Sequence, residues 1–303
     1  MSSEGSHPAS AAARRRVVLG VCGGSGLYAM DALADARAVE VATPFGAPSG
    51  PYTVGELPRN DGPGVKAVFL PRHGAGHRKT PTEINYRANI HGFKQLGVTH
   101  LVSVSAVGSL REAIEPGHLV CVDQFIDRTR GRPTTFFGDG AVVHVQFGEP
   151  TDAALRGRLQ QAAKTTGATV HGDGTLVVIE GPTFSTRAES ELFRSWGAHV
   201  VGMTALPEAR LAREAELSYC LLALSTDYDC WHTEEVSVAS VMEVMAANVD
   251  NARKTIAALA AALPEHTEAL PYPPACEGAL MTAPEHLGAD TRRKLDLLIG
   301  HYL

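Results

Sequence analysis

The hydrophobic and polar positions of the chain predict strands and helices that alternate almost throughout. Short apolar runs that end in turn residues are typical of buried strands, whereas apolar positions three and four residues apart indicate helices. We predict strands at residues 17–22, 52–57, 65–71, 101–105, 118–125, 175–179, 199–204 and 217–224. We predict helices at residues 27–35, 80–96, 155–165, 186–196, 207–216, 237–262 and 291–302. This alternation predicts a single α/β domain, with a mixed, largely parallel, twisted sheet flanked by helices.

The same pattern divides the chain into an arm, a domain and a tail. Residues 1–15 are mostly small and polar, and we expect them to form a disordered N-terminal arm. Residues 16–265 carry the alternating pattern and form the domain. The tail of residues 266–303 contains a Pro-rich linker and ends in a short amphipathic helix. Within the domain, residues 127–148 lose all periodicity, and a loop of that length is usually functional or part of an interface.

The composition is that of an ordinary globular protein, with 44% hydrophobic and 20% charged residues among 303. A net charge of -6, without any Lys/Arg-rich block, argues against nucleic acid as a partner. No apolar run approaches the ~18 residues that a membrane-spanning helix needs. Arg14–Arg16 precede an apolar stretch, as in a signal peptide, but this stretch is short and ends in glycines. The five scattered cysteines are typical of reduced thiols, so we expect a cytoplasmic protein.

Two carboxylates, Asp227 and Asp229, follow the predicted strand at residues 217–224. In open α/β sheets, ligands bind beyond the carboxyl ends of the strands. A carboxylate there can exchange a proton with a ring nitrogen or accept a hydrogen bond from an amino group. The alternative is a solvated acidic turn that caps the next helix, and the local pattern leaves both interpretations open.

Four other strand ends carry groups that suit an anion: Ser25, Arg72–His73, Ser105–Ala106 and Met203–Thr204. Each supplies a hydroxyl, a cation or free backbone N–H groups. If the strands are parallel, these groups meet at one edge of the sheet. The sequence therefore predicts a phosphate site there, beside the two carboxylates.

Each of these motifs also has another interpretation. The glycine turn around Ser25 fits a G-x-G-x-x-A dinucleotide fingerprint, but the acidic residue that would bind the ribose is missing. His73 and His77 are spaced like a metal pair, yet glycines separate them and no third ligand is evident. The same segment can also form a basic turn on the surface.

Beyond single motifs, nine segments in order resemble the methylthioadenosine phosphorylases, a group in the trimeric branch of the purine nucleoside phosphorylases. The resemblance spans about residues 17–265, without the arm and the tail. The segments are Gly23-Gly-Ser-Gly-Leu27, Thr43-Pro-Phe-Gly46, Arg72-His-Gly74, Asn85-Tyr-x-Ala-Asn-Ile90, Gly108-Ser-Leu-Arg111, Asp123-Gln-Phe-Ile-Asp-Arg-Thr129, Glu180-Gly-Pro-x-Phe-Ser185, Met203-Thr204-x-x-Pro-Glu208 and Thr226-Asp-Tyr-Asp-Cys-Trp231.

This resemblance implies phosphorolysis of a purine nucleoside, with phosphate as the second substrate and no cofactor or metal. It implies that phosphate is held by Ser25, Arg72, His73, Ser105, Ala106 and Thr204. Asp227 then faces the purine N7 as general acid, and bound phosphate is the nucleophile that attacks C1'. Asp229 faces the 6-amino group, which favours adenine over 6-oxopurines.

The resemblance also assigns the walls of the nucleoside site. Met203 is expected under the ribose, and Phe184 and Ser185 beside the base. The expected 5' pocket consists of Val238, Val241 and Met242, together with His144 from a neighbouring subunit of a homotrimer whose sites lie near the subunit interfaces. Without the resemblance, the spacing of Val238, Val241 and Met242 indicates the core face of a helix.

At four positions the chain departs from the resembling enzymes. Ser25 and Ser105 stand where those enzymes carry Thr, which keeps the hydroxyl. Val107 replaces a frequent Cys, and Gly202 replaces an Asn beside the base. Gly202 is shared with enzymes for 6-oxopurines, so a broader phosphorylase that accepts adenosine or inosine is an alternative. A nucleoside-binding sensor without catalysis is the non-enzymatic alternative.

Overall fold

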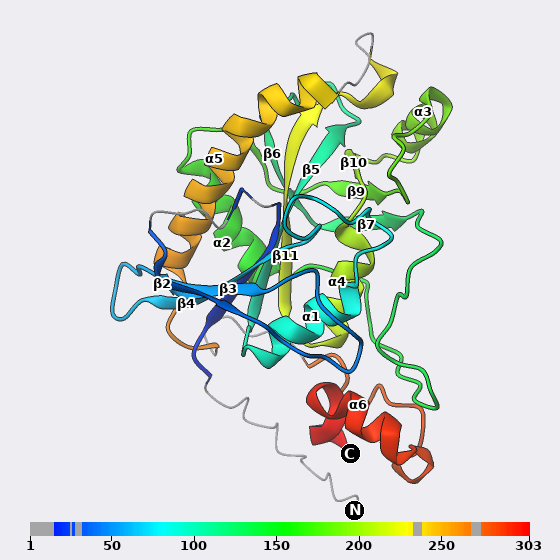
Figure 1. The fold of residues 1–303 in the computed structure, drawn as a ribbon. Helices are drawn as coiled ribbons and strands as arrows, with labels where there is room; N and C mark the ends of the chain where they lie inside the picture. The colour runs from blue at the N-terminus through cyan, green and yellow to red at the C-terminus, as the bar shows by residue number, and fades with distance from the viewer. Residues whose placement is uncertain (1–14, 25, 28–31, 233–237, 268–273) are drawn as a thin grey trace, which may run out of the picture.

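The structure, a computed structural model, describes residues 15–24, 26–27, 32–232, 238–267 and 274–303. For residues 238–241 and 243 it describes the backbone alone. The described strands form one eleven-stranded sheet with helices on both faces (Figure 1). None of the described helices is long and apolar enough to span a membrane.

The strands are β1 Val18–Gly23, β2 Ala34–Val39, β3 Tyr52–Leu57, β4 Val65–Pro71, β5 His100–Ser109, β6 Leu119–Val122, β7 Gln124–Asp127, β8 Val170–His171, β9 Thr175–Val178, β10 Val200–Gly202 and β11 Ser218–Asp227. The helices are α1 Tyr86–Gln95, α2 Ala153–Lys164, α3 Arg187–Ser195, α4 Ala205–Glu214, α5 Val238–Ala262 and α6 Ala289–Ile299. A short 3₁₀ turn, η1 Asp229–Trp231, follows β11 directly.

The sheet is mixed and largely parallel at its centre, which confirms the predicted fold class. β4, β1, β5 and β11 run parallel to one another. β5 is the central strand of the sheet, and β11 pairs along almost the whole of one of its edges. Its other edge pairs with β1 over residues 100–103 and then with β10, in the antiparallel sense, at residues 108–109.

Two apolar cores lie on opposite faces of the sheet. α2 and α5 cover one face with side chains such as Leu155 and Ile256. α1 and α4 cover the other with side chains such as Phe93 and Leu211. Successive side chains of a strand point to opposite faces, so the continuous apolar run of β11 supplies both cores.

Several predicted boundaries were wrong, for identifiable local reasons. The helix expected at residues 27–35 conflicts with β2, which begins at Ala34 and was missed. The helix expected from Thr80 begins six residues later, because Thr80 and Glu83 close a turn and Asn85 is the N-cap. The single strand expected at residues 118–125 is two strands, β6 and β7, with different partners.

The α3 start and the tail helix were predicted more closely. Thr186 and Glu189 form the predicted capping box at the start of α3. The tail ends in α6, and Glu216 anchors it by accepting hydrogen bonds from the amides of Ala275 and Cys276. The linker at residues 271–274 lies almost entirely outside the described residues, as does the arm up to residue 14.

Candidate active site

The candidate site lies at an opening in the sheet beside β5. Among the described residues, no strand pairs with Val104–Val107 on the edge between β1 and β10. As a result, Ala106 is exposed and Ser105 only half-buried, although β5 lies in the middle of the sheet. Arg72, which directly follows β4, enters this opening. Its Nη1 donates to the carbonyl of Val104 at 3.1 Å and to Ser105 Oγ at 3.2 Å.

Thr204 reaches the same opening from the opposite direction. β10 runs antiparallel to β5, so the residues that follow it pass back along β5. The Oγ atoms of Thr204 and Ser105 lie 3.1 Å apart. The expectation of four parallel strand ends was therefore wrong for β10, but its antiparallel course still brings Thr204 to Ser105. The predicted Ser25 lies outside the described residues.

His73 lies beside Arg72 as a neutral ring. Its Nδ1 is 2.8 Å from the carbonyl of Lys79, and its ring stacks on His77 with the centroids 4.0 Å apart. Burial lowers the pKa of His73 to about 4. At neutral pH Nδ1–H therefore donates to the carbonyl of Lys79 and Nε2 is an acceptor, so the cation at this strand end is Arg72 and not His73.

Asp227 and Asp229 form a compact, partly buried pair. Asp227 Oδ1 accepts from the amide of Asp229 at 2.8 Å, and its Oδ2 accepts from Thr226 Oγ1 at 2.7 Å. Asp229 is only 3% exposed, with a φ of 53° that turns the chain back after β11. Burial raises the pKa of both carboxyls, and the charge of Asp227 adds to the effect at Asp229. The alternative of a solvated acidic turn is therefore wrong.

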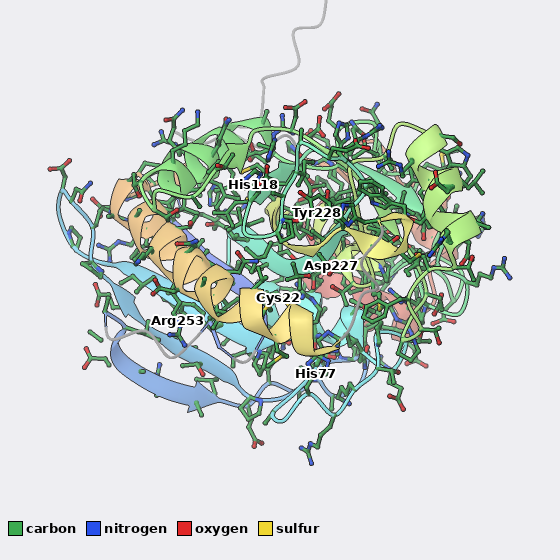
Figure 2. All side chains as sticks on the ribbon, turned by 90° about the horizontal axis from the view of Figure 1, so that it is seen from above. Cys22, His77, His118, Asp227, Tyr228 and Arg253 are labelled. Atoms are coloured by element: carbon green, nitrogen blue, oxygen red, sulfur yellow. The ribbon has the colours of Figure 1, made fainter. Side chains whose placement is uncertain are left out.

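Gly108 allows this pair to pack against β5. A Cβ atom at Gly108 would lie 3.0 Å from Asp227 Oδ1 and 3.2 Å from Asp229 Cβ. Three residue steps along β5 separate Gly108 from Ser105, a distance of about 10 Å. The carboxylate pair and the Arg72–Ser105–Thr204 group thus lie along one strand. In Figure 2, which is turned by 90° from Figure 1 and seen from above, the labels of Cys22, His77 and Asp227 lie around the first turns of α5.

The loop at residues 180–185 forms a wall between Met203 and η1. A Cβ at Gly181 would lie 2.5 Å from Met203 Sδ, so Met203 packs directly on this loop. Cys230 Sγ donates to the carbonyl of Ser185 at 3.1 Å. Ser185 Oγ is buried and has no hydrogen-bond partner among the described residues. Phe184, on the same loop, is 48% exposed.

The residues predicted for the 5' pocket are only partly described. Val238 and Val241 lie in the first turns of α5, of which only the backbone is described. Met242 is 63% exposed. His144 is exposed and lies beside the tail, where its amide donates to the carbonyl of Ala279 at 2.9 Å. Its loop lies near α6 at the bottom of Figure 1, far from the upper end of β11, so the chain does not bring His144 to its own Asp pair.

Comparison with known proteins assigns the chain to a family. The model of the phosphorylase superfamily matches residues 18–261. The chain belongs to this superfamily. The S-methyl-5'-thioadenosine phosphorylase of Geobacter sulfurreducens is 53% identical over 289 residues, covering 94% of this chain and 99% of that protein. The Thermosynechococcus vestitus enzyme of the same name is 49% identical, with the same coverage of both chains.

Solved structures agree with this membership of the phosphorylase superfamily. A methylthioadenosine phosphorylase from an antarctic soil metagenomic library matches with a TM-score of 0.85 and 43% identity, covering 94% of this chain and 99% of that one. A variant of the adenosine/methylthioadenosine phosphorylase of Schistosoma mansoni, in complex with methylthioadenosine, matches with a TM-score of 0.76 and 38% identity. That match covers 81% of this chain and 91% of that one.

Two buried charged residues of this phosphorylase-superfamily site were not singled out from the sequence. Arg132, whose side chain is fully buried, donates from Nη1 to the carbonyl of Met203 and from Nη2 to that of Glu180, both at 2.6 Å. It therefore fixes the two loops that carry the expected ribose and base contacts. Its signal was an arginine inside the long loop expected to be functional. Glu208 lies beneath Arg72, and its signal was a glutamate among the apolar positions of α4.

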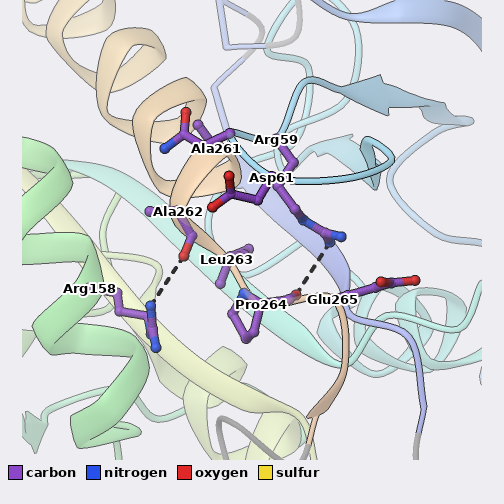
Figure 3. Close-up of a pocket in the computed structure, with 9 residues that line it drawn as sticks. Arg59, Asp61, Arg158, Ala261, Ala262, Leu263, Pro264 and Glu265 are labelled. Carbon is purple, nitrogen blue, oxygen red and sulfur yellow. Dashed lines mark hydrogen bonds between the residues drawn. The ribbon is translucent and has the colours of Figure 1, made fainter.

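A hollow of about 410 Å³ at the carboxyl end of α5 does not contain the candidate residues, and Figure 3 shows the side chains that line it. There Arg158 donates to the carbonyl of Ala262 and Arg59 to that of Pro264. The 25 residues of α5 place this hollow about 37 Å from the start of the helix. Within the described part of the chain, no group of three or more His, Cys, Asp or Glu could hold a metal ion.

Proposed function

We propose that this protein catalyses the phosphorolysis of 5'-methylthioadenosine to adenine and 5-methylthioribose 1-phosphate. The observation that carries the proposal is the partly buried Asp227–Asp229 pair, which lies about 10 Å along β5 from Arg72, Ser105 and Thr204. The 53% identity to a methylthioadenosine phosphorylase over 94% of the chain supports it. A related Schistosoma mansoni enzyme was solved with methylthioadenosine, which supports the same nucleoside.

At the phosphate end, the anion would meet side chains and backbone around the opening beside β5. We assign this end to Ser25, Arg72, His73, Ser105, Ala106 and Thr204. The exposure of Ala106 supports this assignment, as does the contact between the hydroxyls of Ser105 and Thr204. Neutral His73 can accept a hydrogen bond from a phosphate O–H through Nε2.

At the base end, Asp227 would act as general acid. As the bond between the base and C1' breaks, negative charge develops on the purine and positive charge on the sugar. A protonated Asp227 can deliver its proton to N7, a contribution that is typically ~10²–10⁴ in rate. The raised pKa of Asp227 supports this role, because burial favours the protonated form. Bound phosphate forms the new bond to C1' and stabilises the positive sugar.

The remaining contacts would select the substrate. Asp229 would accept a hydrogen bond from the 6-amino group of adenine. We assign the base contacts to Phe184 and Ser185, the ribose contact to Met203, and the 5' pocket to Val238, Val241 and Met242. The buried, unpartnered hydroxyl of Ser185 supports its assignment.

We further propose a homotrimer in which His144 of one subunit completes the 5' pocket of the next. The position of His144 beside the tail, away from the Asp pair of its own chain, supports this arrangement. Val142 and Met281, 48% and 64% exposed, lie next to it and offer apolar surface for a neighbouring subunit. The five free thiols fit a reducing compartment, so we place the enzyme in the cytoplasm. The reaction as proposed needs phosphate but no cofactor.

The test is the release of adenine from methylthioadenosine with and without phosphate. Phosphorolysis predicts release only when phosphate is present. Equal release without phosphate would identify a hydrolase and contradict the proposal. Binding without any release would favour the nucleoside sensor. The broader phosphorylase is favoured by Gly202, which has no side chain beside the base, and hypoxanthine release from inosine at a similar kcat/KM would establish it.

A further inference from the structure

A buried ion pair between Arg72 and Glu208 lies beneath the candidate phosphate site. The two residues are only 2% and 1% exposed. Arg72 Nε donates to Glu208 Oε2 at 2.8 Å, and Arg72 Nη2 lies 3.3 Å from Glu208 Oε1. A two-pronged contact of this kind fixes the orientation of the guanidinium as well as its position. Arg72 therefore cannot turn without breaking the pair.

The other N–H groups of Arg72 also point at acceptors. Nη2 donates to Ser103 Oγ at 2.6 Å and to the carbonyl of Cys22 at 3.0 Å. Nη1 donates to Ser105 Oγ and to a main-chain carbonyl of β5. Because Ser105 Oγ accepts from Arg72, the single proton of its hydroxyl is left to donate elsewhere. The available acceptors are Thr204 Oγ1, 3.1 Å away, and an anion in the opening.

Glu208 is itself held from two strands. Tyr219 Oη, on β11, donates to Glu208 Oε1 at 3.2 Å, and Cys22 Sγ, on β1, donates to Oε2 at 3.2 Å. Tyr219 and Cys22 are both fully buried. The carboxylate is thus fixed by contacts from β1, β11 and Arg72, while its own backbone belongs to α4. A carboxylate so tightly held is suited to orient its partner.

We propose that Glu208 is a positioning residue for phosphate. Glu208 fixes the guanidinium of Arg72, and Arg72 in turn donates a hydrogen bond to Ser105 Oγ. The hydroxyl proton of Ser105 is then directed toward the bound anion. This inference rests on the proposed function, since it requires phosphate to bind at Ser105 and Thr204. The Arg72–Glu208 pair carries no net charge, and His73 is neutral at neutral pH. The site therefore meets phosphate largely with oriented O–H and N–H groups, and their orientation depends on Glu208.

The experiment is steady-state kinetics of Glu208→Gln, which keeps the shape of the side chain and removes its charge. We expect KM for phosphate to rise at least tenfold, equivalent to about 1.4 kcal/mol of binding. KM for methylthioadenosine and kcat at saturating phosphate should change less than threefold. A merely structural role would lower kcat by reducing the active fraction and leave KM for phosphate unchanged. An unchanged KM for phosphate would overturn the proposal. A lower KM for phosphate would also overturn it, because it would mean that phosphate takes the place of the lost carboxylate beside Arg72.

A matched control and a double variant sharpen this test. Glu214 is a second buried carboxylate on α4, but it accepts from Thr135 Oγ1 and the amide of Phe136, away from the site. Glu214→Gln should leave KM for phosphate unchanged. If Glu208 acts through Ser105, its substitution should have little effect once the Ser105 hydroxyl is absent. KM for phosphate in the double variant Ser105→Ala/Glu208→Gln should therefore be less than twofold above that of Ser105→Ala alone. Full additivity of the two substitutions would contradict this route.

Two further measurements cover failure of the variant or of the proposed function. If Glu208→Gln does not fold, Tyr219→Phe removes only one hydroxyl donor to Glu208, and KM for phosphate should rise two- to fourfold; no rise would count against the inference. If the wild-type protein releases no adenine, the proposed function fails by itself. The inference is then decided by the rise in Tm that phosphate causes. A smaller rise for the Tyr219 variant than for wild type supports it, and equal rises overturn it.

Discussion

Replacing Asp227 by Asn removes the proposed general acid and should leave the fold almost unchanged. The Asn Oδ1 can still accept from the amide of Asp229, which now bonds to Asp227 at 2.8 Å. Thr226 Oγ1 also lies 3.2 Å from the carbonyl of Val107, so its proton has another acceptor and its oxygen can accept from the new amide. At most one ordinary hydrogen bond weakens, at a cost of about 1 kcal/mol in stability.

The cost in catalysis should be far larger. General-acid catalysis contributes ~10²–10⁴ in rate, which corresponds to roughly 2.7–5.4 kcal/mol of barrier. An Asn amide can donate a hydrogen bond to N7 but cannot transfer a proton. It also tolerates the electronic pattern of a 6-oxopurine better than a carboxylate does. We therefore expect kcat/KM for methylthioadenosine to fall at least a hundredfold and the ratio of inosine to adenosine turnover to rise.

The assay follows base release from methylthioadenosine, adenosine and inosine, with Tm measured in parallel. The control is Asp127→Asn at the end of β7, because Asp127 likewise accepts from the amide two residues on, that of Thr129. Asp127→Asn should keep nearly full activity. A loss of less than tenfold in Asp227→Asn would refute the assignment of Asp227 as the general acid, and an unchanged inosine-to-adenosine ratio would refute the expectation that an Asn at this position favours 6-oxopurines.

Three further predictions concern packing, selectivity and pH. Gly108→Ala should lower kcat/KM roughly tenfold, since its Cβ would displace Asp227 by a few tenths of an ångström; unchanged kinetics contradicts this. A Cβ at Gly202 would lie 3.3 Å from Val107 Cγ1, so Val107 leaves little room for a side chain at this position. Gly202→Asn should therefore favour adenosine over inosine only when it is combined with Val107→Ala. The values of kcat/KM for both nucleosides test this. Burial raises the pKa of Glu214 to about 7, so the folded protein keeps a proton that the unfolded chain loses above about pH 4.5. The free energy of unfolding should therefore fall as pH rises from about 4.5 to about 7, by up to roughly 3 kcal/mol in total, and this contribution should level off above pH 7. Denaturant titrations should find this slope reduced in Glu214→Gln.

The sequence located most of the strands, although not β2 or β8, because apolar runs and turn residues act over a few positions. Asp227, Arg72 and Thr204 were all singled out as candidates in this way. Sequence periodicity does not determine which strands pair or in which direction, so the antiparallel course of β10 was not predicted. It also did not predict the opening at Val104–Val107, which exists only because β1 ends where β10 has not yet begun.

Contacts between distant residues were equally inaccessible. Arg72 and Glu208 are 136 positions apart, and nothing in the segment of either residue indicates the other as its partner. Only the folded sheet brings the residue after β4 against the face of α4. The neutral state of His73 was also missed, because it depends on burial and on the carbonyl of Lys79 rather than on neighbouring residue types. Local chemistry could be predicted from the sequence, whereas charge states and long-range pairs could not.

The two ends of the site differ in how freely they can change. Arg72 at the phosphate end is tied to Glu208, Ser103 and Cys22, which are all buried and belong to three different elements. A substitution there leaves a buried charge or donor without a partner, which is costly to the fold. The proposed base end includes the loop at residues 180–185, which lies outside both cores, so side chains such as the exposed Phe184 can change without affecting either core. Substitutions that alter nucleoside preference should therefore occur at exposed positions such as 184, while those at 72, 103 and 208 should affect phosphate binding and stability together.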